Sequence, residues 1–415
     1  MIVTKKKYVL VGTGGRGVGM FARPLLTTHA ANADLVGVFD PNPKRMEGAQ
    51  AWLGRQLLAF NDFDKMLADT QPDCVVVASR DCTHADYVVR GLKAGKRIYV
   101  EKPLCTTAKQ CREILAAARE SKNLCLVTHN MRYDLACISI RSIVQQERIG
   151  RLLFVQLHET LDRSHGADYF RRWHRNLANS GGLQIHKASH HFDMLNWWIG
   201  SKPATVRAQG GLHVYGKNNP YRGRCCRDCQ HTKHCPFFVD YSKIDVYKKL
   251  YFDAEAVDGY LRDGCVFDPS IDIQDQLSVH IRYENGVDVN YSLLAHAAYE
   301  GMNVTMDGTL GRMEHSSSYI PTEMAAYGLI AGEKQRVIVP GYPVLDVPIN
   351  RGDGDHGGAD PSLRADFFDR DWSLAPNSQM ASVDQAVQAV LIGVAITKSI
   401  QTGGTVNVQD LLNHD

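Results

Sequence analysis

Residues 7–17 read KYVLVGTGGRG, a short apolar strand that runs directly into a G-x-G-x-x-G turn. A helical stretch over 18–28 follows, and the apolar run at 34–39 is typical of a second strand. This order of strand, turn, helix and strand is the context in which a glycine turn binds a dinucleotide. An ordinary flexible turn uses glycine as freely but lacks that context.

The glycines of the motif have separate roles in such a turn. Gly12 allows the tight turn, Gly14 lets the backbone approach a pyrophosphate, and Gly17 lets helix and strand pack closely. Amide groups at the helix N-terminus then face the phosphates, so Gly15 and Arg16 are also predicted to bind the cofactor.

Asp40 ends the second predicted strand, 23 residues after Gly17. An acid near this position accepts hydrogen bonds from the adenosine ribose hydroxyls and repels a 2′-phosphate. The sequence therefore predicts NAD as the cofactor, with NADP less favoured, although Lys44 and Arg45 follow closely.

Composition and charge exclude several classes of protein. The 415 residues are 44% hydrophobic and 22% charged, as in a globular chain of two or three domains. A net charge of +2 predicts no strong attraction to nucleic acid or to a membrane surface. No run approaches the roughly 18 apolar residues of a membrane span, and the first strand starts too early for a signal peptide. We therefore expect a cytoplasmic protein.

Strands and helices alternate over the first 130 residues. The run at 73–78 is apolar after Asp73, as in a strand buried on both faces, and further strands are predicted at 97–100 and 124–128. This alternation predicts an α/β fold whose first domain, residues 1–130, is a Rossmann domain with a doubly wound parallel sheet.

The pattern changes after residue 130. A helix is predicted over 182–199, and strands at 276–283 and 287–294 flank a hairpin signal at 284–286. Residues 131–415 are therefore predicted to form an α+β domain with an open, mostly antiparallel sheet.

In this order and spacing, the motifs resemble the Gfo/Idh/MocA family of nicotinamide-dependent enzymes (glucose–fructose oxidoreductase, inositol dehydrogenase and MocA). The resemblance covers nearly the whole chain. It implies that the second domain carries the substrate pocket and makes the oligomer contact, so we expect a homodimer or homotetramer. Besides the glycine turn with Asp40, its markers are His84…Gly91…Ala94-Gly95-Lys96, Glu101-Lys102-Pro103, Asn130-x-Arg132-Tyr133, Gly181-Gly182 and His190-x-x-Asp193.

The resemblance also implies which residues do the chemistry. It assigns substrate-side catalysis to the lysine of Glu-Lys-Pro, here Lys102, and to an Asp-x-x-x-His pair. Alignment on Asp193 places the family histidine at His190 and the family aspartate at His186. The aspartate is therefore absent, and the proton relay departs from the family pattern.

Oxidation of a secondary alcohol gives these residue types plausible roles. A base must take the hydroxyl proton, and the imidazole pKa of His190 lies near working pH. Lys102 is a compact cation that stabilises a developing alkoxide, and a relay through His186 stays open. On the predicted helix His186, His190 and Asp193 share one face, where they also have the spacing of metal ligands. Histidines satisfied within a helix are the structural alternative.

The other candidates belong to the cofactor and substrate sides of the same predicted site. A sugar wall is expected from residues 169–174, because aromatic faces stack on sugar C–H groups, although ordinary packing gives the same pattern. A polar loop around His356 is predicted to cover the site. The predicted cofactor-binding residues are Gly12, Gly14, Gly15, Arg16, Gly17, Asp40, Ser79, His84, Glu101, Lys102 and Asn130. The predicted substrate-binding residues are Lys102, Arg132, Tyr169, Arg172, Trp173, His174, His186, His190 and Asp193.

A compact group of cysteines lies in a predicted insertion near residues 217–240. Cys226-x-x-Cys229 followed by Cys235 is compatible with a structural zinc site, with Cys265 or a local histidine as fourth ligand. Reduced thiols without metal, and a disulfide or redox role, stay open.

The resemblance, taken with these residues, implies an NAD-dependent oxidoreductase that transfers a hydride between a sugar or glycoside hydroxyl and the nicotinamide, giving a ketosugar. Residues 169–174 with Gly181-Gly182 also resemble a glycoside-processing branch of the family, some of whose members use the nicotinamide transiently to cleave glycosides. An NAD-using glycosidase or lyase is therefore the main alternative, and a non-catalytic cofactor-binding regulator is another. A small-molecule sugar or glycoside is the expected partner.

Overall fold

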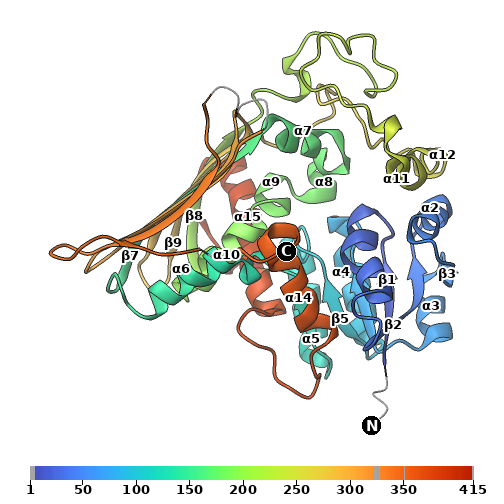
Figure 1. The fold of residues 1–415 in the computed structure, drawn as a ribbon, viewed down its shortest axis with the longest axis horizontal. Helices are drawn as coiled ribbons and strands as arrows, with labels where there is room; N and C mark the ends of the chain where they lie inside the picture. The colour runs from blue at the N-terminus through green and yellow to red at the C-terminus, as the bar shows by residue number, and fades with distance from the viewer. Residues whose placement is uncertain (1–4, 322–324, 326–327, 350, 414–415) are drawn as a thin grey trace.

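Two sheets organise the chain in the computed structural model, which describes residues 5–321, 325, 328–349 and 351–413. One sheet has seven strands in the order β15-β6-β5-β4-β1-β2-β3. The other has nine, in the order β14-β13-β12-β11-β7-β10-β9-β8-β16. Figure 1 shows the second sheet standing to one side of the first, with helices between them.

The first sheet is the predicted doubly wound sheet. β1 pairs in parallel with both β2 and β4, whereas β15 runs antiparallel to β6. Every residue of β4 is buried, as expected for an apolar run covered on both faces. The strands are β1 (Lys6–Val11), β2 (Ala33–Phe39), β3 (Ala59–Phe60), β4 (Cys74–Val77), β5 (Arg97–Val100), β6 (Cys125–Val127) and β15 (Ala381–Ser382).

Two of the longer helices of this unit begin at capping residues. Asn42 caps α2 by accepting a hydrogen bond from the Arg45 amide, and Thr107 caps α5 in the same way. The helices are η1 (Gly17–Ala22, π type), α1 (Arg23–Leu26), α2 (Pro43–Leu53), α3 (Phe63–Thr70), η2 (Asp81–Thr83), α4 (His84–Lys93), α5 (Ala108–Glu120) and η3 (Asn130–Tyr133).

The strand order reverses at β1, which lies between β2 and β4. In open α/β sheets, ligands bind beyond the carboxyl ends of the strands at such a switch point. The glycine turn follows β1 directly, so the topology places the predicted phosphate cradle at the position where a dinucleotide binds.

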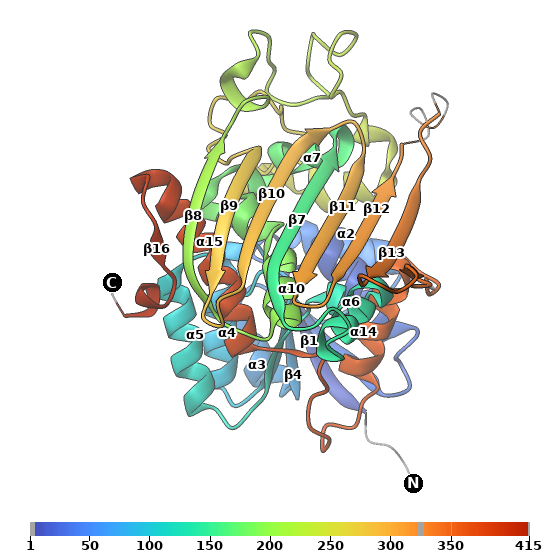
Figure 2. The same cartoon turned by 90° about the vertical axis from the view of Figure 1, so that its left-hand side faces the viewer.

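The second sheet is mostly antiparallel, as predicted, with a parallel pairing between β7 and β10. Side chains of β9 alternate strictly between exposed and buried, and Figure 2 shows one face of this sheet without a covering helix. The strands are β7 (Leu152–Asp162), β8 (Pro203–Gly211), β9 (Gln276–Tyr283), β10 (Asp288–Ala297), β11 (Glu300–Gly308), β12 (Arg312–Tyr319), β13 (Gly332–Ile338), β14 (Leu345–Asp346) and β16 (Val406–Asn407).

Helices cover the other face of the second sheet and fill the long connection between β8 and β9. The predicted single helix over 182–199 is wrong, because the chain forms α9 and α10 with a break at Lys187 and Ala188. The helices are α6 (Leu135–Gln145), α7 (Arg163–Arg171), η4 (Trp173–Arg175), α8 (Leu177–Ser180), α9 (Leu183–His186), α10 (Ser189–Ile199), η5 (Gly216–Asn218), η6 (Tyr241–Lys243), α11 (Asp245–Tyr247), η7 (Lys248–Phe252, π type), α12 (Glu255–Asp258), η8 (Asp355–Gly358), α14 (Ala359–Phe368), α15 (Val383–Thr402) and η9 (Gln409–Leu412).

The chain returns to the first sheet after it completes the second. Phe367 and Phe368 of α14 are buried against Tyr8 of β1 and Tyr99 of β5. Residues 359–382 therefore pack with the N-terminal unit, although they follow the second sheet in sequence.

Helix α15 is long and apolar enough to cross a membrane by length and composition. Most of it is buried in the protein, where it packs between β8, α10 and α5. The sequence predicts a helix over 385–402 but no membrane span, and the burial of α15 is that of a core helix.

An ion pair between Arg132 and Asp193 fixes the start of α6 against α10. Two hydrogen bonds of 2.7 Å join the guanidinium to the carboxylate, and both side chains are almost fully buried. Arg132 also donates to the Gln385 side chain at 3.0 Å.

We predict that Arg132→Met lowers the free energy of unfolding by about 3 to 5 kcal/mol, because it leaves a buried carboxylate without its partner. The matched control is Arg282→Met, which removes the exposed Arg282–Asp288 pair and should leave the urea midpoint unchanged. Equal midpoints for the two variants would contradict the assignment.

Candidate active site

A groove of about 280 Å³ lies beyond the carboxyl end of β1. Gly12 has a φ of +95°, and a Cβ there would lie 2.5 Å from the Ala78 carbonyl oxygen. A Cβ on Gly17 would overlap the carbonyl oxygen of Gly12. Gly14 and Gly15 face open space apart from the hydroxyl of Tyr251. The turn thus leaves room for a pyrophosphate against its backbone, so these residues fit a dinucleotide.

Asp40 lines this groove, but its side chain is almost fully buried and bonded to neighbouring residues. Its Oδ2 accepts hydrogen bonds from the Thr13 amide at 2.9 Å and from Thr13 Oγ1 at 3.1 Å. Its Oδ1 lies 3.2 Å from the guanidinium of Arg45, which also pairs with Asp258 at 2.6 Å. Asp40 therefore braces the glycine turn as well as facing the groove.

Residues 241–258 of the long β8–β9 connection, here called the cofactor arm, fold back over the groove. The Gly15 amide donates a hydrogen bond of 2.9 Å to the hydroxyl of Tyr251. The Asn42 side-chain amide donates to the Ala254 carbonyl, also at 2.9 Å. An amide that would otherwise face a phosphate is therefore bound by the arm.

An apolar contact anchors the cofactor arm to α2. Leu250 is fully buried against Val18 and Ala49. Gly48 lies where α2 meets the arm, and a Cβ at this position would overlap the carbonyl oxygen of Lys249. The sequence reading missed this arm, for which a glycine inside a helix was the available signal.

A second cavity of about 360 Å³, here called the first chamber, adjoins the cofactor groove. Arg16, Ser79, Arg172 and Trp173 line both cavities, so a dinucleotide held in the groove would reach the first chamber at this junction. Most of the predicted site residues meet in the first chamber, namely Arg16, Ser79, His84, Glu101, Lys102, Asn130, Tyr169, Arg172, Trp173, His174, His186 and His190.

Lys102 reaches the first chamber from the end of β5. Its Nζ donates a hydrogen bond of 3.0 Å to the carbonyl oxygen of His186. Burial lowers the pKa of Lys102 to about 8, although the charges of Glu101 and Asp81 favour the protonated form. The ammonium is therefore charged at neutral pH and loses its proton under mildly alkaline conditions.

Asp81 supplies a carboxylate that the sequence reading did not find. Its Oδ2 lies 2.6 Å from Nδ1 of His186; Asp81 is buried and His186 is partly buried. Burial raises the pKa of Asp81 and lowers the pKa of His186, so the pair shares a proton with no net charge. Asp81 begins η2 in the first domain, far from His186 in sequence, so no local spacing connects them.

His190 lines the same chamber and is partly buried. Its Nδ1 has no hydrogen-bond partner within the described part of the chain. Burial, and then the charge of Lys102, lower the pKa of His190 well below its ordinary value. The imidazole is therefore neutral and able to accept a proton.

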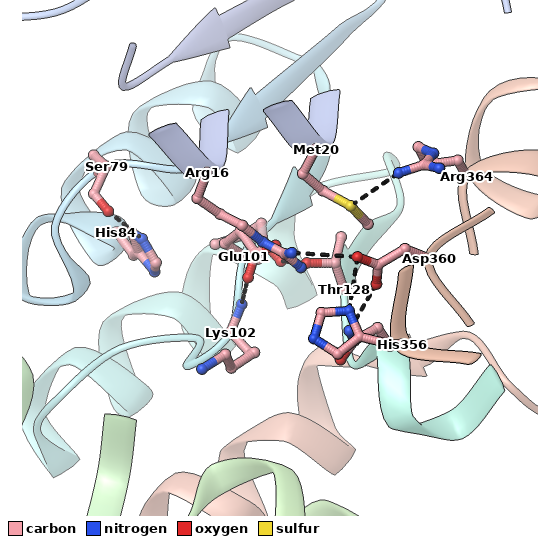
Figure 3. Close-up of polar contacts among 12 residues, drawn as sticks. Arg16, Met20, Ser79, His84, Glu101, Lys102, Thr128, His356, Asp360 and Arg364 are labelled. Carbon is pink, nitrogen blue, oxygen red and sulfur yellow. Dashed lines mark hydrogen bonds and ion pairs between the residues drawn. The ribbon is translucent and has the colours of Figure 1, made fainter. Parts of the chain in front are cut away.

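A carboxylate from α14 closes the network on the other side of Lys102. Figure 3 shows Arg16 between Glu101 and Asp360. The Arg16 guanidinium lies 2.7 Å from Glu101 and 3.4 Å from Asp360. Asp360 also accepts a hydrogen bond of 2.7 Å from Asn130 and lies 3.0 Å from Nδ1 of His356. The predicted polar loop thus reaches the site through His356 and Asp360.

The predicted sugar wall is an aromatic stack. Trp173 and His174 lie face to face with ring centroids 3.6 Å apart, and His174 meets His186 edge-on at 4.0 Å. Tyr169 contacts His174 and His186 from a second direction. Trp173 and Tyr169 therefore present rings to the first chamber.

Two predicted substrate ligands lie outside the site. Arg132 and Asp193 bond to each other in the buried pair described above, and neither lines the first chamber. The break between α9 and α10 separates Asp193 from His186, so the helical face expected to join them does not form.

The structure does not show the predicted zinc site in the cysteine insertion. Cys226, Cys229, Cys235 and Cys265 surround one small cavity, but the Arg171 guanidinium donates to Cys226 Sγ at 3.4 Å. Across the described ranges, no three His, Cys, Asp or Glu side chains gather closely enough to hold a metal ion. All eleven cysteines are free thiols.

Comparison with known families agrees with this geometry. Residues 6–129 match the Gfo/Idh/MocA "Oxidoreductase family, NAD-binding Rossmann fold", and residues 141–408 match its "C-terminal alpha/beta domain". The chain belongs to this family. It is therefore an oxidoreductase with an NAD-binding domain.

Individual relatives are distant. YteT of Bacillus subtilis is 30% identical over 98% of both chains. An inositol 2-dehydrogenase of Rhizobium meliloti is 29% identical over 48% of this chain and 58% of its own. Levoglucosan dehydrogenase, solved with NADH and L-sorbose, superposes with a TM-score of 0.70 at 18% identity, covering 98% of this chain and all of that one. At this low identity, the superposition with levoglucosan dehydrogenase shows that the two chains share a fold.

We predict that Asp81→Asn lowers kcat about 100-fold while the dissociation constant for NADH stays unchanged, because the amide no longer fixes the His186 tautomer. The pH dependence of kcat should also change, which a purely structural role would not produce. Asp86→Asn, at an exposed position of α4, is the control and should match the parent. A loss of NADH binding in Asp81→Asn would contradict the assignment.

We predict that Gly48→Ala raises the NADH dissociation rate, because the new methyl group displaces the cofactor arm at Lys249. Stopped-flow fluorescence of bound NADH measures this rate. Gly404→Ala is the matched control, since a Cβ there makes an ordinary contact. An unchanged rate in Gly48→Ala would show that the arm does not retain the cofactor.

Proposed function

We propose that this chain is an NAD-dependent carbohydrate dehydrogenase that transfers a hydride between a secondary hydroxyl of a sugar or glycoside and the nicotinamide, giving a ketosugar. The observation that carries the proposal is the convergence of Lys102, His190 and the Asp81–His186 pair on a chamber that adjoins the cofactor groove. The inositol 2-dehydrogenase among the relatives supports a polyhydroxylated substrate.

The protein side chains divide the work of alcohol oxidation. When bound, NAD accepts the hydride from the sugar carbon. His190 is neutral, so it accepts the proton of the reacting hydroxyl. The Lys102 ammonium stabilises the negative charge that develops on the alkoxide oxygen. Asp81 holds the tautomer of His186, and Trp173 at the junction of the cavities shields the reacting atoms from water.

NAD is favoured over NADP by the charges at the adenosine end of the groove. Asp40 provides a carboxylate there, which repels a 2′-phosphate. Arg45 is already engaged by Asp40 and Asp258, so its charge is not free to bind that phosphate.

A second candidate is a glycoside-cleaving reaction in which the sugar is oxidised transiently and the hydride returns. The cofactor arm favours it, because Tyr251 lines the groove and binds the glycine turn, which would help to retain the cofactor. A retained cofactor suits a catalytic cycle in which the substrate undergoes no net oxidation. The same site residues serve both reactions.

A homodimer or homotetramer remains our proposal for the oligomer, and it is supported by the family resemblance, which places the oligomer contact in the second domain. Light scattering should report a dimer or a tetramer, and a monomeric mass would refute this.

The deciding experiment follows NADH absorbance while the protein with NAD is offered free sugars, inositols and aryl glycosides, with aglycone release measured in parallel. Stoichiometric NADH is the expected result and establishes the dehydrogenase. Aglycone release without net NADH would establish the second candidate. Neither signal with any substrate would reject both.

We predict that kcat/KM for oxidation falls as pH rises through about 8, because Lys102 then loses the charge that stabilises the alkoxide. Lys102→Arg keeps a cation at these pH values, so this limb of the profile should disappear. Lys102→Met should lower kcat about 10²- to 10³-fold across the range. A rate that increases through pH 8 in the parent would instead make neutral Lys102 the base.

A further inference from the structure

A third cavity, here called the second chamber, lies beyond the first and has a volume of about 490 Å³. It shares Asn130, Lys187 and His356 with the first chamber. It shares no lining residue with the cofactor groove. The three cavities therefore form a row, and the second chamber lies on the side of the first chamber away from the cofactor.

The size of this row exceeds what NAD and a single sugar ring require. Pockets for small ligands typically measure about 300 to 1,000 Å³, and the first chamber alone falls in that range. If the substrate were a monosaccharide, the second chamber would have no occupant during the reaction.

The second chamber contains buried polar atoms without partners. His315 is 3% exposed, and its Nδ1 has no hydrogen-bond partner among the described residues. Asn130, at the boundary of the two chambers, is equally buried and its Oδ1 is likewise unpaired there. Unsatisfied buried groups are rare and destabilising, so both atoms indicate a polar ligand or ordered water.

The charges of the lining favour a neutral ligand. Four carboxylates line the second chamber against two cations, and Glu159 and Lys187 already pair with each other at 3.0 Å. Arg351 is likewise held by Glu333 at 2.9 Å. No free cation in the described lining is thus left for an anionic group, whereas carboxylate oxygens accept hydrogen bonds from hydroxyl groups. The lining carboxylates are Asp134, Glu159, Glu300 and Glu333, and the cations are Lys187 and Arg351.

We propose that the second chamber binds a neutral, hydroxyl-rich ring covalently linked to the sugar that is oxidised. The substrate is then a disaccharide, or a glycoside with a similar aglycone, whose linkage passes between Asn130, Lys187 and His356. Apolar surface from Met302 and Tyr319 is available to the C–H face of the ring. This inference rests on the proposed dehydrogenase function.

Met302→Trp tests the proposal by filling the second chamber. Met302 is 9% exposed on β11, and the next residue, Asn303, points to the opposite, exposed face of the sheet. Asn303→Trp is therefore a matched control that adds the same side chain outside the cavity. The holoenzyme with NAD is assayed with hexoses, with maltose, cellobiose and lactose, and with a disaccharide whose second ring is a uronate.

The expected result is that Met302→Trp raises KM for the accepted disaccharide about tenfold or more, while KM for the matching monosaccharide and the NADH dissociation constant stay the same. Asn303→Trp should match the parent on all three. Equal effects of Met302→Trp on monosaccharide and disaccharide would overturn the proposal, as would preference for a disaccharide with a uronate second ring.

Calorimetric binding of the same disaccharides to the NADH complex separates this inference from the proposed function. In one outcome, no sugar reduces NAD, but a disaccharide binds to the parent and not to Met302→Trp. The second chamber is then a sugar-binding site, and the proposed dehydrogenase function is rejected. If neither saccharide class binds more weakly to Met302→Trp, the second chamber is not a sugar site. A change of oligomeric mass in Met302→Trp would assign the cavity to a subunit contact and also overturn the proposal.

Discussion

The arrangement of the whole site depends on one buried carboxylate, Asp360. It is 2% exposed and is reached by Arg16 of the glycine turn, Asn130 after β6 and His356 of the preceding loop. Although burial raises the pKa of this group, the hydrogen bond from His356 and the charge of Arg16 lower it to about 2. A charge this deep is stable only with such partners, so the returning α14 and the glycine turn must keep their relative positions.

That constraint links binding to chemistry. Arg16 joins Asp360 to Glu101, and Glu101 precedes Lys102. The ammonium of Lys102 is thereby placed at the first chamber from a rigid strand end rather than from a mobile loop. Asn130 and His356, which also hold Asp360, form part of the boundary with the second chamber. The same contacts therefore organise the cofactor side and the substrate side.

The histidine at position 186 shows how a missing acid is replaced in space. An aspartate at this position would have supplied a carboxylate directly to the chamber. Here His186 occupies it, and Asp81 contributes the carboxylate from the first domain at 2.6 Å. The proton-sharing capacity of the site is retained, but it now depends on the docking of two domains. The cofactor arm adds a further dependence, because a segment of the second domain binds the glycine turn of the first.

The sequence by itself determined the two fold classes and the family, since strand periodicity and the glycine turn are local signals that survive without tertiary context. Its motifs also predicted Lys102 and His190 as site residues, and both line the first chamber. Only the tertiary structure decided three contacts of the site, namely the pairing of Asp81 with His186, the contact of Asp360 with Asn130 and the contact of Tyr251 with Gly15. Each joins residues more than 100 positions apart. It also placed Arg132 and Asp193 outside the site. The helix breaks after α9, so Asp193 does not lie beside His186 as the helical spacing had predicted, and the charges of Arg132 and Asp193 are paired with each other.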